Sequence, residues 1–120
     1  MPTDLSCERF LAKAANLLAA MANAKRVLIL EIVSKQEISV GPLAVMAGLS
    51  QSALSQHLGK LRGAKLVQTR QHAQTVFYRS DSDEVRRMLQ TLYDIFGAVS
   101  PLISSVDLSE KRPASVTGPA

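Results

Sequence analysis

The chain has 120 residues and a mass of 13.0 kDa, a size that fits one domain, and its 47% of hydrophobic residues exclude global disorder. Fourteen Lys and Arg against ten Asp and Glu give a net charge of +4, which suits an acidic or phosphate-bearing partner. Apolar runs fall short of the ~18 residues that span a bilayer, and the N-terminus shows no secretory signal. A single cysteine forms no internal disulfide. We therefore expect a cytoplasmic protein.

Two amphipathic helices are predicted in the first third of the chain. From Cys7 to Met21, apolar residues recur at spacings of three and four, which is typical of a helix with one apolar face. Asn23 can cap a second helix. The apolar residues from Val27 to Val33 occupy most of its circumference, so we expect it at the centre of the core. Residues 1–6 are expected to be flexible.

A short helix, a glycine turn and a longer helix are predicted next. Ser39 can cap the short helix, Pro42 fits its first turn, and Gly48 ends it. Ser50 can then cap a helix that runs to about Ala64. This arrangement is typical of a helix-turn-helix. The predicted buried positions are Val40, Leu43, Ala44 and Ala47 on the short helix and Leu54, Leu58 and Leu61 on the longer one.

A β-hairpin and a last helix complete the predicted domain, residues 7–99. The strands are Leu66 to Thr69 and Thr75 to Tyr78, joined by the polar segment 70–74. Asp81 or Ser82 can cap the last helix, and the composition of residues 100–120 predicts a disordered tail. The order of elements predicts a mainly α winged helix-turn-helix with a small β-hairpin. The apolar seam of the last helix consists of Val85, Met88, Leu89, Leu92, Ile95, Phe96 and Val99.

Positive charge is concentrated in the second half of the helix-turn-helix and in the hairpin. The segment from Ser50 to Arg79 has five basic residues and no Asp or Glu, whereas the rest of the chain has nine basic and ten acidic residues. A solvated helix face normally carries both signs. We therefore predict a phosphate-facing surface with unpaired cations, namely Lys60, Arg62, Lys65, Arg70 and Arg79.

Short amides and hydroxyls occupy the exposed N-terminal half of the longer helix. The residues are Gln51, Ser52, Ser55 and Gln56, at positions where surface helices commonly carry Glu and Lys. Gln can pair bidentately with adenine, and Ser can donate to or accept from several base edges. Ser and Gln are also common on ordinary helix surfaces, but the charge distribution and the helix-turn-helix spacing favour base recognition.

Three stretches of the sequence resemble the ArsR-type winged-helix repressors of bacteria. They are AAMANAKRVLILEIV at the second helix, GLSQSALSQHLGKLR at the recognition helix and LVQTRQHAQTVFYRS at the wing. The resemblance covers Ala19 to about Phe96, and three such stretches in the right order and spacing are specific for the family. It implies a homodimer that binds an inverted-repeat operator in double-stranded DNA and blocks transcription.

The resemblance also assigns residues to DNA and to the partner subunit. The base-recognition positions of the family fall on Gln51, Ser52, Ser55 and Gln56, with Val40 close to the groove. The charge distribution adds Lys60, on the same helix, to the predicted DNA-binding residues. The wing positions fall on Arg70, His72 and Gln74. Dimerisation is expected through the first and last helices, by Phe10, Leu11, Leu17, Leu18, Met88, Leu89, Leu92, Ile95 and Phe96.

The chain departs from metal-sensing members of the family at both of their sensor sites. Arsenic and cadmium sensing uses a Cys-x-Cys pair at the start of the short helix, where this chain has Ile38-Ser39-Val40-Gly41-Pro42. Zinc and nickel sensing uses His among the ligands on the last helix, and residues 81–99 contain no His. A metal needs about four convergent ligands. We therefore expect no metal and no other cofactor.

For three further residues we favour a structural role over a role in DNA binding or redox chemistry. His57 follows the base-recognition positions, and bracing the helix is favoured over base contact. Arg26 lies in the first turn of the second helix, where a cation is mildly unfavourable, so Glu31 or an acid of a partner chain is expected to pair with it. Cys7 is most simply a small hydrophobic residue, with a redox function as the less favoured alternative.

Other function classes remain as alternatives to a sequence-specific repressor. An enzyme is disfavoured because no nucleophile-base set, phosphate-binding glycine loop or paired-carboxylate site can be placed in the sequence. A winged-helix module for protein or RNA contacts would not need the polar face from Gln51 to Gln56. A repressor that senses a non-metal inducer also remains open.

Overall fold

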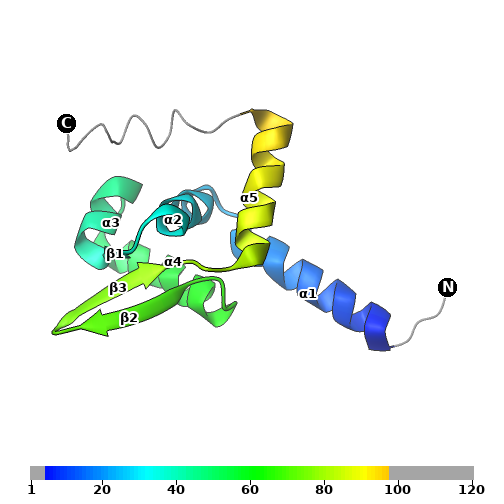
Figure 1. Cartoon of the computed structure of the whole chain (residues 1–120), viewed down its shortest axis with the longest axis horizontal. Helices are drawn as coiled ribbons and strands as arrows, with labels where there is room; N and C mark the ends of the chain where they lie inside the picture. Colours follow the sequence, from blue (N-terminus) through cyan, green and yellow to red (C-terminus); the bar gives the residue numbers. More distant parts are fainter. Residues whose placement is uncertain (1–4, 98–120) are drawn as a thin grey trace. The chain divides into compact units, whose positions relative to one another are not determined.

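Five helices and a three-stranded antiparallel sheet make up the computed structural model over residues 5–97, which are the residues it describes (Figure 1). The predicted fold class, mainly helical with a small sheet, is confirmed. None of these helices is long and apolar enough to cross a membrane. The elements are α1 (Leu5–Met21), α2 (Ala24–Lys35), β1 (Ile38–Ser39), α3 (Val40–Ala47), α4 (Gln51–Gly63), β2 (Gln68–His72), β3 (Thr75–Arg79) and α5 (Asp83–Phe96).

The α2 helix lies at the centre of the core, as its apolar circumference predicts. It contacts α1, α3, α4 and β3, and its residues Ile29 to Val33 are buried. The Asn23 side chain caps it by accepting hydrogen bonds from the backbone amides of Lys25 and Arg26 at 2.9 and 3.1 Å. The fully buried side chains around α2 include Leu43, Leu54, Leu58 and Leu61 from α3 and α4.

The turn between α3 and α4 is held by local chemistry at both of its ends. Gly48 adopts a left-handed conformation with φ of 69°, and its N–H bonds back to α3. Ser50 caps α4, since its Oγ accepts from the amide of Ala53 at 3.1 Å. Lys25 Nζ donates to the carbonyl of Ala47 at 2.6 Å and so ties the start of α2 to the end of α3. These contacts fix the helix-turn-helix.

The wing is a tight hairpin whose predicted boundaries were wrong. His72 pairs with Thr75, so the turn is only Ala73 and Gln74, and β2 runs through the segment predicted to be a loop. Leu66 and Val67, predicted to begin the strand, are buried ahead of it. The residues from Arg70 to His72 are exposed and polar, and pairing with β3 makes them a strand without any apolar alternation.

Two other features differ from the predictions. The α1 helix begins at Leu5 instead of Cys7, because an apolar period marks a face of a helix and does not mark its first residue. Ser39 occupies the N-cap position of α3 but makes no side-chain capping bond; its backbone belongs to the short strand β1, which pairs with β3. Val99 and the predicted tail, residues 100–120, lie outside the described residues.

The chain divides at Ser82 into two compact units, and α5 forms the described part of the second. Asp83 and Glu84 lie in its first turn, where carboxylates interact favourably with the helix dipole. Asp83 also forms ion pairs with Arg86 and Arg87. Val85 and Leu89 are buried, whereas Ile95 and Phe96 near the end of the helix are exposed.

Candidate nucleic-acid interface

The α4 helix presents an uncharged polar face to solvent. Gln51, Ser52, Ser55 and Gln56 are all exposed, at the spacing that places them along one side of the helix. The opposite side carries Leu54, Leu58 and Leu61, which are at most 1% exposed. The helix is therefore held from behind by the core while its amides and hydroxyls stay free to form hydrogen bonds outward.

Basic residues follow this polar face toward the end of α4. Lys60, Arg62 and Lys65 are exposed, and none of them pairs with a carboxylate within residues 5–97. Lys60 and Arg62 also lie in the last turn of the helix, where positive charge stabilises the carbonyl end. The phosphate-facing role of these three residues stays a prediction.

One face of the wing carries the remaining basic residues. Phe77 of β3 pairs with Arg70 of β2 on one side and with Ser39 of β1 on the other. Directly paired residues share a face of an antiparallel sheet, and neighbours along a strand alternate. Arg70, His72 and Arg79 therefore share the face of Phe77. Ile38 lies on the other face and is 8% exposed, so that face points to the core.

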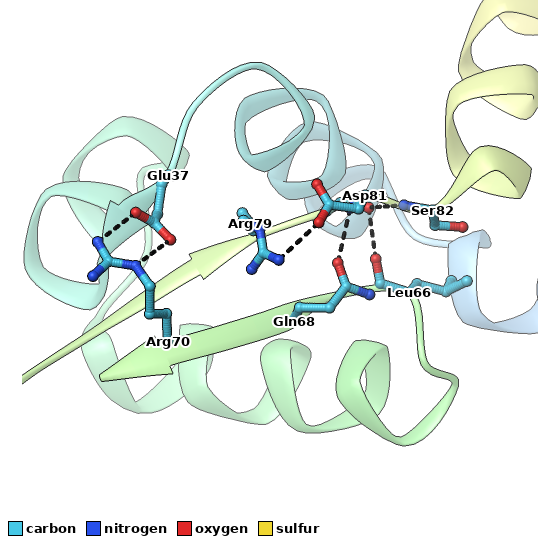
Figure 2. A network of polar contacts seen from close by, with 8 residues as sticks. Glu37, Leu66, Gln68, Arg70, Arg79, Asp81 and Ser82 are labelled. Carbon is cyan, nitrogen blue, oxygen red and sulfur yellow. Dashed lines mark hydrogen bonds and ion pairs between the residues drawn. The ribbon is translucent and has the colours of Figure 1, made fainter. Parts of the chain in front are cut away.

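Both arginines of the wing are paired, contrary to the prediction that they would be free. Figure 2 shows Arg70 donating from Nη2 and Nε to the two carboxylate oxygens of Glu37, at 2.7 and 3.0 Å. Arg79 Nη2 lies 2.8 Å from Asp81 Oδ2. The segment from Ser50 to Arg79 contains no acid, but the fold brings carboxylates to it from just before β1 and just after β3.

The ion pair between Glu37 and Arg70 shifts both groups toward their charged forms. The hydrogen bond from Arg70 lowers the pKa of Glu37, and the charges of Arg70 and Arg79 add to this effect. The same hydrogen bond raises the pKa of Arg70. The Arg70 guanidinium also lies 5.2 Å from the centre of the Phe77 ring, a favourable arrangement of cation and aromatic face.

Polar contacts at the base of the wing join it to the core. Ser80 Oγ donates to the carbonyl of Leu66 at 2.7 Å, and the amide of Asp81 donates to Gln68 Oε1 at 2.8 Å (Figure 2). The amide of Ser80 donates to the carbonyl of Val33 at the end of α2, at 2.9 Å. These bonds satisfy backbone groups that would otherwise be unpaired and fix the direction in which the hairpin leaves the core.

The other predicted contact residues differ in exposure. His72 and Gln74 are exposed at the tip of the wing. Val40 was predicted both to face the core and to lie close to the groove. It is half-buried in the first turn of α3. The structure thus leaves the whole predicted set accessible at least in part.

His57 on α4 and Arg26 on α2 are both half-buried. Burial lowers the pKa of His57, and the charges of Arg26 and Lys60 lower it further, which disfavours the charged form of the ring. This favours the bracing role. Glu31 Oε1 lies 3.3 Å from Lys35 Nζ one turn away, and no ion pair joins Glu31 to Arg26 in the described part of the chain. The alternative partner for Arg26, an acid of a partner chain, stays a prediction. Arg26 Nε is buried without a hydrogen-bond partner within residues 5–97.

The predicted dimer residues are mostly exposed on their own helices. On α1, Phe10, Leu11 and Leu18 are 66, 58 and 56% exposed. Leu17 is half-buried. On α5, Ile95 and Phe96 are exposed, Met88 and Leu92 are half-buried, and Leu89 is already buried in the single chain. Large exposed apolar side chains of this kind commonly mark a protein interface.

Potential metal ligands do not cluster in the described part of the chain. Within residues 5–97, no group of three or more His, Cys, Asp or Glu side chains is arranged to hold a metal ion.

Comparison with known families and proteins gives consistent matches. Residues 23–69 match the family described as bacterial regulatory protein, arsR family. The nodulation protein NolR of Rhizobium meliloti is 52% identical over 83% of this chain and 77% of its own length. The transcriptional activator HlyU of Vibrio cholerae is 51% identical over 74% of this chain and 82% of its own length. The resemblance carried by the three sequence stretches is confirmed.

Solved structures share the fold. The crystal structure of NolR from Sinorhizobium fredii superposes with a TM-score of 0.77 at 50% identity, covering 82% of this chain and 99% of that one. A homodimeric winged helix-turn-helix DNA-binding domain from Mycobacterium bovis gives a TM-score of 0.69 at 23% identity, covering 79% and 88% of the two chains. The second similarity concerns the fold alone.

Proposed function

The chain belongs to the ArsR family of bacterial regulatory proteins, and from this we propose that it represses transcription by binding an inverted-repeat operator in double-stranded DNA as a homodimer. The family is described as one of bacterial regulatory proteins, and a winged helix-turn-helix DNA-binding domain shares the fold. The proposal places the protein in the cytoplasm, with the DNA that it regulates. The relatives include an activator, HlyU, so repression is the part of the proposal that needs a direct test.

The observation that carries the proposal is the exposed face of Gln51, Ser52, Ser55 and Gln56 on α4. An outward row of amides and hydroxyls suits base edges in the major groove, which present donors and acceptors at fixed positions. The cap at Ser50 and the three buried leucines hold this row in place. A module for protein contacts would have no need of an uncharged hydrogen-bonding face beside unpaired cations.

Selection of binding sites from random duplexes tests base recognition and symmetry together. Two copies of α4 related by a dyad should enter successive major grooves, so the selected site should be an inverted repeat with half-site centres about one helical turn apart. A transcription assay from a promoter carrying this site then decides between repression and activation. Selection of no sequence, or retention on RNA or a protein instead of duplex DNA, would contradict the proposal.

We also propose that the dimer forms through the apolar faces of α1 and α5. Leu92→Glu would place an unpaired charge in the α5 seam and should give a monomer with weak, non-specific DNA binding. Gln90→Glu puts the same charge at an exposed position of the same helix and should remain dimeric. Sedimentation equilibrium measures both, and a wild-type monomer at micromolar concentration would contradict the proposal.

Regulation by a metal is not part of the proposed function. The start of α3 offers no thiolate or imidazole, and α5 offers no His. Zinc, cadmium or arsenite should leave operator affinity unchanged below concentrations that precipitate the protein. Stoichiometric binding with a tenfold change in affinity would show that ligands are shared between chains.

A further inference from the structure

The carboxylate of Glu37 binds the guanidinium of Arg70, a group that the wing would otherwise present to DNA. Glu37 lies between α2 and β1, and Arg70 reaches it from β2, the far strand of the sheet (Figure 2). Two hydrogen bonds of 2.7 and 3.0 Å engage both carboxylate oxygens. The Glu37 side chain is 29% exposed and that of Arg70 is 50% exposed, so a solvent-borne anion can approach the pair.

Glu37 and a DNA phosphate need the same donors. A guanidinium binds carboxylate and phosphate through the same planar fork of N–H groups. Arg70 has committed Nε and Nη2 to Glu37, so a phosphate that uses this fork must displace the carboxylate. Phe77 lies beneath the guanidinium at 5.2 Å and can keep it in place whichever anion is bound.

A DNA phosphate can compete with Glu37 for Arg70. An exposed ion pair is weak, because solvent screens both charges, so a well-placed phosphate can replace the carboxylate. On random DNA the wing meets phosphates in no fixed register, and the Glu37 carboxylate also repels them. When the α4 face is bound to its preferred bases, the wing is held at one register and a phosphate can stay beside Arg70.

We propose that Glu37 is an internal competitor of DNA phosphate, which withholds Arg70 until a phosphate of the bound operator takes its place. The inference rests on the proposed function in DNA binding and adds a role for a residue outside the α4 face. It predicts that loss of the carboxylate strengthens binding to the operator, where the ion pair must be broken, more than binding to random DNA, where the pair stays intact.

The test compares wild type with Glu37→Gln on the selected operator and on a random duplex of equal length. Glu37→Gln should raise affinity for the operator about tenfold for the dimer, since two exposed ion pairs no longer have to be broken. The gain on random DNA should be about threefold or less, because a phosphate in no fixed register binds Arg70 more weakly than the carboxylate does. The salt dependence on random DNA should steepen by about one unit for each freed guanidinium.

Two control variants separate this role from a general effect of charge. Asp94→Asn removes one negative charge from α5 without freeing an arginine of the wing, and it should change neither affinity by more than about twofold. The double variant Glu37→Gln with Arg70→Gln should lose the gain of Glu37→Gln, because the guanidinium that the carboxylate withholds is gone.

Each outcome is decisive. An equal gain on operator and random DNA, a gain that persists without Arg70, or a loss on both duplexes would overturn the inference and leave Glu37 as a brace of the wing. If wild type prefers its operator while Glu37→Gln is inert, only this inference fails. If wild type binds no duplex, the proposed function fails, and the inference fails with it.

Discussion

The α4 face and the wing carry the same kind of charge in the sequence but differ in the folded chain. Lys60 and Arg62 on α4 have no carboxylate partner within residues 5–97, whereas Arg70 and Arg79 on the wing are both bound by carboxylates. Buried leucines hold α4 from behind, and exposed polar contacts hold the wing. The two segments have similar basic residues in the sequence. In the folded chain α4 offers DNA free cations, whereas the arginines of the wing must first be released from their carboxylates.

The largest expected effect is on the free energy of unfolding, because α4 is held by buried leucines and the wing is not. Leu58 is 1% exposed, and Leu58→Ala should lower the free energy of unfolding by about 2–5 kcal/mol, because it removes buried apolar area and leaves a cavity. Val76 on the wing is 37% exposed, and Val76→Ala should change it by less than about 1 kcal/mol. Urea unfolding at fixed protein concentration measures both. Similar losses in the two variants would show that the wing also packs against a buried surface, for example in the dimer.

The second largest difference between α4 and the wing should be in their contribution to base recognition. Gln56→Ala should weaken operator binding by about 1–3 kcal/mol and relax the base preference at one position in each half-site, with little change on random DNA. Gln74→Ala at the tip of the wing should weaken both duplexes alike, if at all. Competition binding against single-base operator variants measures the preference. An equal loss on operator and random DNA for Gln56→Ala would make Gln56 a backbone contact.

The salt dependence of binding tests the free and paired cations directly. Lys60→Gln should reduce the salt slope by about one unit per protomer, since an unpaired lysine releases a counterion when it meets a phosphate. Arg79→Gln should reduce it less, because Asp81 already neutralises Arg79. Affinities from low to moderate salt give both slopes. Equal reductions would mean that the pairing on the wing does not persist in the complex, and a flat wild-type profile would remove phosphate contact from both regions.

The α4 face could be predicted from the sequence because every contribution to it is local. The cap at Ser50, the leucine period and the polar positions between the leucines all lie within one helix. The wing could not be predicted to the same degree. Glu37 is 33 residues from Arg70, and no local pattern links them. The strand β1 has only two residues and exists because β3 pairs with it, so its own sequence does not predict it.

Acid should remove the small stabilising contribution of the wing ion pair and leave the α4 cations unaffected. The hydrogen bond from Arg70 places the pKa of Glu37 below its usual value of 4.5 in the folded chain. A lowered carboxyl pKa adds stability above the unfolded value, and that stability is lost as the pH falls through the folded value. Wild type should therefore be slightly more stable than Glu37→Gln at pH 7.

This gap between wild type and Glu37→Gln should close as the pH falls below about 4.5, the range in which the carboxylate of the wild type takes up a proton. The Asp83 pKa is also lowered, chiefly by the hydrogen bond from Arg86, so total stability falls in the same range and only the difference between the two proteins isolates Glu37. Lys60→Gln should show no such closing gap against wild type, because Lys60 has no carboxylate partner within residues 5–97. Urea unfolding from pH 7 to pH 3 measures these differences. A gap that persists in acid would mean that the Glu37 side chain supports the wing by its shape, and Arg70 would then be as free of charge compensation as the cations of α4.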